Sequence, residues 1–231
     1  MKKYLFLLFL LPGWALAQNW QIVEASSSED LSGKVSTHLQ YLFPEFTLGE
    51  VFFLNAPKGN GLLNYNMLAG EMQFIDNDDV MALANVRNVA VVNIENRKFY
   101  PLNSKEFTEE LLSTDRFQLR VRRKGSVIQH SKNSAYGTSS STSSITSYSS
   151  VNNDGGQFIN LKVSSNVLVS LKYFYYLVGS NGKYTQIKNI KTFTKQFPAH
   201  SAKIEAFAKE RRIRFDNEED LKTLLVYCSD L

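Results

Sequence analysis

Several stretches of this chain alternate apolar and polar residues one by one, and only an extended strand turns such a pattern into one apolar and one polar face. Phe117, Leu119 and Val121, for example, are separated by polar residues. The same alternation occurs at 63–67 and 159–163. Three further apolar runs indicate strands with both faces partly covered, at 50–54, 72–75 and 89–94. The pattern is typical of an antiparallel sheet that leaves one face in water.

The clearest local prediction is a β-hairpin near the C-terminal third of the chain. A run rich in aromatic and β-branched residues spans 167–178, and strand-like sequence resumes at 184–187. Between them lies Asn181-Gly182, a pair that tolerates the positive φ angles of a tight turn. Weaker turn signals occur at 56–61 and 95–98.

After residue 190 the apolar spacing becomes helical. The spacing of five apolar residues predicts two short helices interrupted at Pro198. The five are Phe193, Phe197, Ile204, Phe207 and Ala208. Asp216 or Asn217 is expected to cap a final helix, with Glu219 or Asp220 placed to reach back to the cap. That helix carries one apolar stripe, made of Leu221, Leu224, Leu225 and Cys228. The fold we expect is α+β and mainly β: a curved antiparallel sheet, or a partly closed barrel, with the helices of 191–231 packed on it.

The N-terminus has the pattern of a cleavable export signal. Lys2 and Lys3 precede an apolar run at 4–11, and Ala15-Leu16-Ala17 presents the small residues that a signal peptidase accepts. The apolar run is shorter than the ~20 residues that a spanning helix needs. We therefore expect 1–17 to be a signal peptide and 18–231 a single exported domain without a transmembrane segment. The residue directly after the cleavage site is Gln18 and not a cysteine, so a lipoprotein is not expected.

Charge and cysteine content narrow the function classes. The formal net charge is +4, of which Lys2 and Lys3 account for two, so the mature chain is too weakly basic to indicate a nucleic-acid partner. The chain has one cysteine, Cys228, which excludes an intramolecular disulfide. Its place in the apolar stripe favours a small buried residue, and a reactive thiol is the alternative.

The sequence presents no catalytic or metal-binding pattern. His38, His130 and His200 have no ligand at a recognised metal-binding spacing. A Ser–His hydrolase based on His130 would need an orienting acid and a nucleophile elbow, and the G-x-S-x-G elbow is absent from the sequence. The oxygen-rich 76–79 lacks the glycine and glutamate of an EF-hand and is better explained as a turn. We assign no catalytic residue, no metal and no cofactor.

The segment 131–150 has a composition unlike the rest of the chain, with ten serines and three threonines. So little apolar area cannot offset the entropy of ordering it as part of a core. One interpretation is a solvated connector, and the other is a binding loop. Tyr136, Ile145 and Tyr148 favour the second, because a connector has no need of sizeable apolar side chains. The loop is entered from the basic run 120–124, in which Arg120, Arg122 and Lys124 share one face of a strand and are either a binding patch or an ordinary solvated face.

Several segments together have a distinctive sequence, at 41–46, 49–53, 63–68, 70–75, 135–140 and 213–222. With them, the sequence resembles a family of exported proteins of the Bacteroidetes over most of the mature chain. The resemblance implies a cell-envelope setting in a Gram-negative cell and a Ser-rich segment that belongs to the domain, and it brings no catalytic role.

Two functions from different classes are compatible with these observations. The first is a non-enzymatic binding or assembly module that recognises an envelope protein in the periplasm or at the periplasmic face of the outer membrane, with secretion as an open alternative. Its partner-binding residues would be Tyr136, Tyr148, Arg122, Arg123 and Lys124, since tyrosine and arginine are common energetic anchors of interfaces. The second is a periplasmic carrier of a lipid or another apolar ligand, whose cavity the strand 167–178 would line.

Overall fold

The computed structural model describes residues 20–25, 33–129, 152–153, 157–158 and 165–231. The predicted signal peptide, the Ser-rich segment 131–150 with Tyr136 and Tyr148, and the predicted strand 159–163 lie outside these residues.

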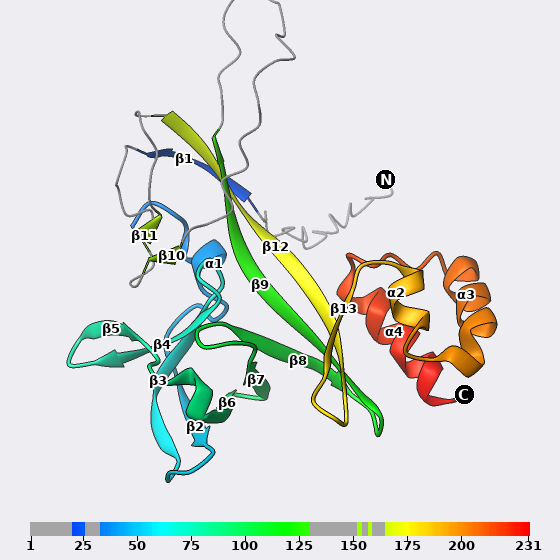
Figure 1. Cartoon of the computed structure of the whole chain (residues 1–231). Helices are drawn as coiled ribbons and strands as arrows, with labels where there is room; N and C mark the ends of the chain where they lie inside the picture. The colour runs from blue at the N-terminus through cyan, green and yellow to red at the C-terminus, as the bar shows by residue number, and fades with distance from the viewer. Residues whose placement is uncertain (1–19, 26–32, 130–151, 154–156, 159–164) are drawn as a thin grey trace, which may run out of the picture.

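The strands of the described residues form one large antiparallel sheet and one small one (Figure 1). In the large sheet the order is β1-β12-β9-β8-β7-β6-β2-β3-β4-β5. β13 pairs with 175–178 of β12, beyond the part of β12, 165–170, that pairs with β1. The sheet is open, so the partly closed barrel is not formed. Strand bounds are β1 Trp20–Ala25, β2 Thr47–Phe53, β3 Gly59–Asn66, β4 Glu71–Asp76, β5 Asp79–Ala82, β6 Val89–Ile94, β7 Arg97–Pro101, β8 Phe107–Ser113, β9 Phe117–Gln129, β12 Ser165–Gly179 and β13 Tyr184–Ile187. β10 (Asn152–Asn153) and β11 (Gln157–Phe158) pair with each other.

Two predicted turns are confirmed, and their residues explain them. Asn181-Gly182 lies in the turn between β12 and β13, where Gly182 has φ of 71°. Asn77 and Asp78 join β4 to β5 with φ of 48° and 70°. Positive φ at both central residues is the geometry of a two-residue hairpin turn, and Asn77 and Asp78 have it. The 76–79 segment is therefore a hairpin turn, as expected. The turn between β12 and β13 is longer than the expected two-residue turn: Gly182 has positive φ and Asn181 does not, and the Gly182 N–H bonds to the Gly179 carbonyl at 2.9 Å.

β9 and β12 form a long two-stranded ribbon (Figure 1). Its side chains belong to two hydrophobic cores, which the ribbon connects. The sheet core lies against the upper half of β12 and includes Val167 and Val169. The helix core lies against the lower half and includes Tyr175 and Leu177. Tyr173, between these two pairs, packs against both cores. The ribbon is thus long enough to belong to two packing units at once.

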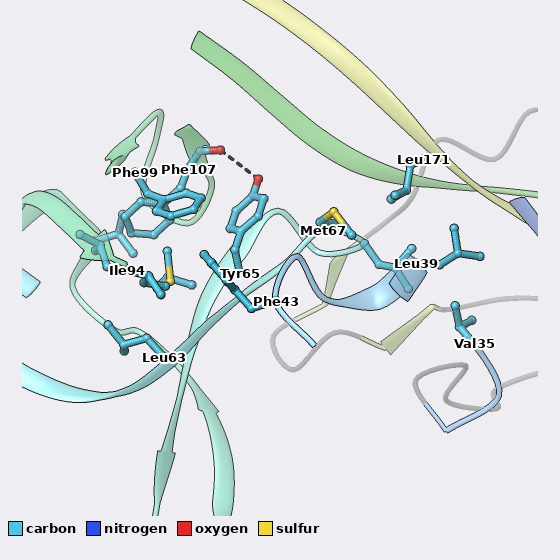
Figure 2. Close-up of a cluster of buried hydrophobic side chains, with 14 of the residues drawn as sticks. Val35, Leu39, Phe43, Leu63, Tyr65, Met67, Ile94, Phe99, Phe107 and Leu171 are labelled. Carbon is cyan, nitrogen blue, oxygen red and sulfur yellow. Dashed lines mark hydrogen bonds between the residues drawn. The ribbon is translucent and has the colours of Figure 1, made fainter. Parts of the chain in front are cut away.

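The sheet core is organised around a fully buried tyrosine (Figure 2). The Tyr65 hydroxyl of β3 donates hydrogen bonds to the carbonyls of Phe107 (3.1 Å) and Arg123 (3.3 Å). Its ring packs 5.4 Å from that of Phe99. Burial raises the pKa of Tyr65, so the hydroxyl remains a donor at any physiological pH. One side chain therefore ties β3 to β8 and β9.

The C-terminal helices cover one face of the lower ribbon, as the sequence predicts (Figure 1). Pro198 begins a 3₁₀ turn that separates two of them, and Leu221, Leu224, Leu225 and Cys228 are all buried in the helix core. The helices are α2 Ile190–Thr194, α3 Ser201–Glu210 and α4 Glu218–Ser229, with 3₁₀ turn η2 at Pro198–His200. Elsewhere α1 spans Thr37–Gln40 and η1 spans Val86–Asn88.

The cap of α4 differs in part from the expectation. Asn217 is the capping residue, and its side chain accepts a hydrogen bond of 3.0 Å from the backbone N–H of Asp220. The Asp220 carboxylate does not bond back to the capping residue as expected. It accepts a hydrogen bond of 2.9 Å from the backbone N–H of Arg214. Glu219 pairs with Lys222 instead. The tight turn before the helix brings the Arg214 backbone within reach, which the sequence spacing did not indicate.

Gly49 of β2 and Gly61 of β3 are direct cross-strand partners with opposite surroundings. A Cβ atom on Gly49 would lie 2.7 Å from the carbonyl oxygen of Asn93, whereas nothing lies within 4 Å of a Cβ on Gly61. We expect Gly49→Ala to lower the free energy of unfolding by about 1–3 kcal/mol, because backbone must move to admit the methyl group.

Gly61→Ala is the matched control, and it should change stability by less than about 0.5 kcal/mol. Chemical denaturation of both variants measures the difference. Equal stabilities would contradict the close approach of β6 to Gly49.

Candidate partner-binding face

The lower ribbon has a second face, opposite the C-terminal helices. Alternation along β9 and β12 sends Leu119, Val121 and Leu177 into the helix core and their neighbours to the other side. That other side carries six aromatic and arginine side chains, which we call the aromatic face: Tyr100 of β7, Arg120 and Arg122 of β9, Phe174 and Tyr176 of β12, and Tyr184 of β13. All but Arg120 are partly exposed.

Strand register brings these side chains together. Arg122 lies directly opposite Phe174, and Arg120 lies directly opposite Tyr176. On the other flank of β9, Glu110 of β8 is the cross-strand partner of Arg120. Directly opposite residues on one sheet face have Cβ atoms about 4.5–5.5 Å apart, so these pairs touch. The guanidinium of Arg122 lies 5.4 Å from the ring centre of Phe174.

Arg120 is the centre of the aromatic face and is only 7% exposed. Its guanidinium lies 3.7 Å from the ring centre of Tyr100 and 5.3 Å from that of Tyr184. It also donates hydrogen bonds to the Tyr184 hydroxyl and, at 3.0 Å from Nε, to Gln118. The Tyr184 ring in turn meets Tyr176 edge-on at 5.9 Å. A buried arginine thus holds partly exposed tyrosine rings in fixed positions.

Polar atoms on this face are left without partners. Oε2 of Glu110 and Nε of Arg122 are buried, and neither has a hydrogen bond within the part of the chain that the structure describes. Burial and the Glu110 carboxylate raise the pKa of Tyr100, which keeps its hydroxyl protonated as a donor. The face therefore offers a partner its partly exposed aromatic rings, whereas these two polar atoms are buried.

At the upper end of the face, Glu106 collects basic side chains. Its carboxylate accepts from Arg122 and, at 2.7 Å, from Asn103, and the Lys124 ammonium lies 3.4 Å away. Burial disfavours the ionised form, but the Asn103 hydrogen bond and the two positive charges outweigh burial and hold the pKa of Glu106 below its usual value. Arg122 and Lys124 are thereby fixed beside the aromatic rings.

The structure separates the residues that the sequence grouped together. Arg122 and Lys124 share the aromatic face, whereas Arg123 points to the opposite side and is 5% exposed. There Arg123 forms an ion pair with Glu109, which also accepts from Arg97. Consecutive residues of a strand point to opposite faces, so a run of three basic residues cannot form one patch. Glu109 and Glu110 are separated in the same way.

The sequence reasoning missed the tyrosines of this face. Tyr100 and Tyr184 carried no motif, although the predicted hairpin register already placed Tyr176 and Tyr184 near the same turn. Arg120, expected on a solvated face if it did not bind a partner, is instead buried under two of these rings. What could not be foreseen is which face of the hairpin the helices would cover.

Other candidate chemistry is accounted for by packing. Cys228 is buried on the α4 stripe, as expected, and burial raises the pKa of its thiol to about 12, which makes the thiolate rare. Among the described residues, no three His, Cys, Asp or Glu side chains gather to hold a metal ion. In the same residues, no helix has the length and apolar character to cross a membrane. The inward side chains of β12, including Val167 and Leu177, are packed in the two cores.

Comparison of the chain with protein-family models, with curated proteins and with solved structures gives no match.

Proposed function

We propose that this chain is a non-enzymatic binding or assembly module of a Gram-negative cell envelope, and that it recognises a protein partner through the aromatic face. The observation that carries the proposal is a row of partly exposed tyrosines held in place by Arg120 on the face that the helices leave open. Tyrosine and arginine are enriched among the residues that dominate binding energy at interfaces.

Preorganisation supports this use of the face. A side chain that is already held loses less conformational entropy when a partner binds, which favours affinity. Arg120 holds Tyr100 and Tyr184, and Glu106 holds Arg122 and Lys124. Of the residues expected to bind, Arg122 and Lys124 remain in the proposed site, and Arg123 does not.

The partner is best sought by crosslinking inside the cell. A photo-reactive phenylalanine analogue replaces Tyr176 in the full chain, and a second variant carries it at the exposed Lys203 of α3 as a control. We expect one recurrent envelope protein crosslinked from position 176 and not from position 203. Tyr176→Ala should then weaken binding of that protein by roughly tenfold or more, as for an interface anchor.

Three results would count against the proposal. Identical protein adducts from both positions would show that the aromatic face is not specific. Lipid adducts without a protein would favour the carrier of an apolar ligand. Unchanged binding of the partner by Tyr176→Ala, with Tyr176→Phe as the conservative reference, would remove this face from the interface.

A further inference from the structure

β5 lies at the end of the large sheet and pairs only with β4 among the strands that the structure describes (Figure 1). The turn residues Asn77 and Asp78 are closed by the pair Asp76 and Asp79. In such a hairpin the closing pair exchanges both main-chain hydrogen bonds, so the next residue, Val80, points its N–H and C=O away from β4. The backbone N–H of Leu83 donates a hydrogen bond of 2.8 Å to the carbonyl of Met72. This agrees with the alternation, in which every second residue bonds toward β4 and the residues between them point away. Within the described ranges, the outward main-chain groups of Val80 and Ala82 therefore have no strand partner.

Apolar side chains reach this edge on both faces of the sheet. On one face Leu63 is paired with Phe74 and Phe74 with Met81, which is 48% exposed. On the other face Val80, paired with Ile75, is 50% exposed. An exposed strand edge with apolar side chains on both sides is a template for pairing with another strand. An added strand would cover Val80 and Met81 together.

A cavity of about 350 Å³ opens beside the C-terminal end of β5, lined by Glu71, Ala82, Asn85, Ser104 and Lys105 among others. The Glu71 side chain is only 4% exposed, and its Oε1 lies 2.7 Å from the Lys105 ammonium. A buried ion pair therefore forms part of the lining of the cavity.

The register places this cavity on the same side as Val80. Gln73 is the partner of Ala82, and Ile75 is the partner of Val80. Glu71 is two residues before Gln73, so its side chain leaves the sheet on the face that Val80 and Ala82 share. A strand added to β5 would therefore present one side chain against Val80 and the next on that face over the cavity.

The turn before β5 is acidic. Asp76, Asp78 and Asp79 are exposed, and the salt bridges found in the described parts of the chain involve none of them. The Asp76 carboxylate accepts a hydrogen bond from the Asn77 side chain, but no basic side chain of the described residues neutralises the three carboxylates. Their negative charge at one end of a binding edge favours a partner with positive charge there.

We propose that the β5 edge and its cavity bind an extended segment of a partner protein by strand addition. The segment pairs its main chain with Val80 and Ala82, places an apolar side chain on Val80, and directs its next side chain on that face over the cavity beside the Glu71–Lys105 ion pair. It carries lysine or arginine beside the acidic turn. Main-chain pairing supplies affinity and the cavity supplies specificity in such sites. The site is separate from the aromatic face, so its test does not depend on the function proposed above.

The test uses a displayed library of random twelve-residue peptides selected on the full chain. Val80→Pro removes an outward N–H that β4 does not use, and Val80→Thr keeps that N–H as the matched control. We expect selected peptides to alternate apolar residues and to contain lysine or arginine. Their binding should fall roughly tenfold or more in Val80→Pro and persist in Val80→Thr. Glu71→Gln should change which side chain is selected over the cavity.

Peptides that bind Val80→Pro as well as the unchanged chain would overturn the proposal, as would a selection that enriches nothing. A dimer of the unchanged chain that Val80→Pro dissociates would assign the edge to a second copy and would also overturn it. If Val80→Pro does not fold, amide hydrogen exchange of the unchanged chain decides: bound peptide must protect the amides of Val80 and Ala82, and unchanged exchange there refutes strand addition.

Discussion

Replacing Glu109 by alanine is expected to lower the free energy of unfolding by about 3–5 kcal/mol. The Glu109 side chain is 4% exposed and accepts from both Arg97 and Arg123. Arg123 is itself buried, and its nearest other carboxylate is Glu218 of α4, 3.9 Å away. Removal of Glu109 therefore leaves a positive charge inside the protein without its main counter-charge. Chemical denaturation measures the loss.

The partner variants separate charge from packing. Arg123→Met with Glu109→Leu removes both buried charges, and it should cost less than the sum of the two single variants, because apolar residues of similar volume can replace a buried pair. Glu50→Ala breaks an exposed ion pair with Lys58 and should change stability by less than about 1 kcal/mol. A loss at Glu109 no larger than the loss at Glu50 would contradict the buried charge.

Phe193→Ala is expected to cost about 3–5 kcal/mol for a different reason. The Phe193 ring is fully buried in the helix core, 5.3 Å from the Phe197 ring and 6.4 Å from the Phe215 ring. Truncation leaves a cavity where α2 meets the segment before α4, and the short α2 cannot close it. Thermal and chemical denaturation should show one destabilised transition.

Val226→Ala, on the solvent-exposed side of α4, is the control. Val226 is 48% exposed on α4, and its truncation should change stability by less than about 0.5 kcal/mol. A Phe193 variant as stable as this control would mean that the helices do not depend on the core they share with the ribbon.

Several elements could be predicted because they depend on neighbouring residues. The hairpin between β12 and β13 follows from Asn181-Gly182, and the α4 stripe follows from the spacing of its apolar residues. The bond formed by the Asp220 carboxylate could not be predicted. The sequence spacing indicated the backbone N–H of the capping residue Asn217 as its donor, but the turn before α4 places the backbone N–H of Arg214 within reach, and this group donates instead.

The candidate site was predicted only in part. Arg122 and Lys124 were identified from their basic run, and they lie on the aromatic face. Tyr100 and Glu110 join them from strands that are ten or more residues away in sequence, through a register that no local pattern contains. Arg123 was assigned to the same patch because it is adjacent in sequence, and it lies on the other side of the strand.

By itself the sequence determined the strands with clear alternation, the 76–79 and 181–182 turns and the C-terminal helices, since alternation, turn residues and caps act between residues a few positions apart. It did not indicate β5, β7 or β8. It did determine that Arg120, Arg122 and Lys124 share a face. Only the tertiary structure decided what that face meets. Helices α2 to α4 cover the side of the ribbon that carries Val121, and this leaves Tyr176 and Tyr184 on the open side. The choice depends on the sum of burial over both faces of the ribbon, which is a property of the whole fold.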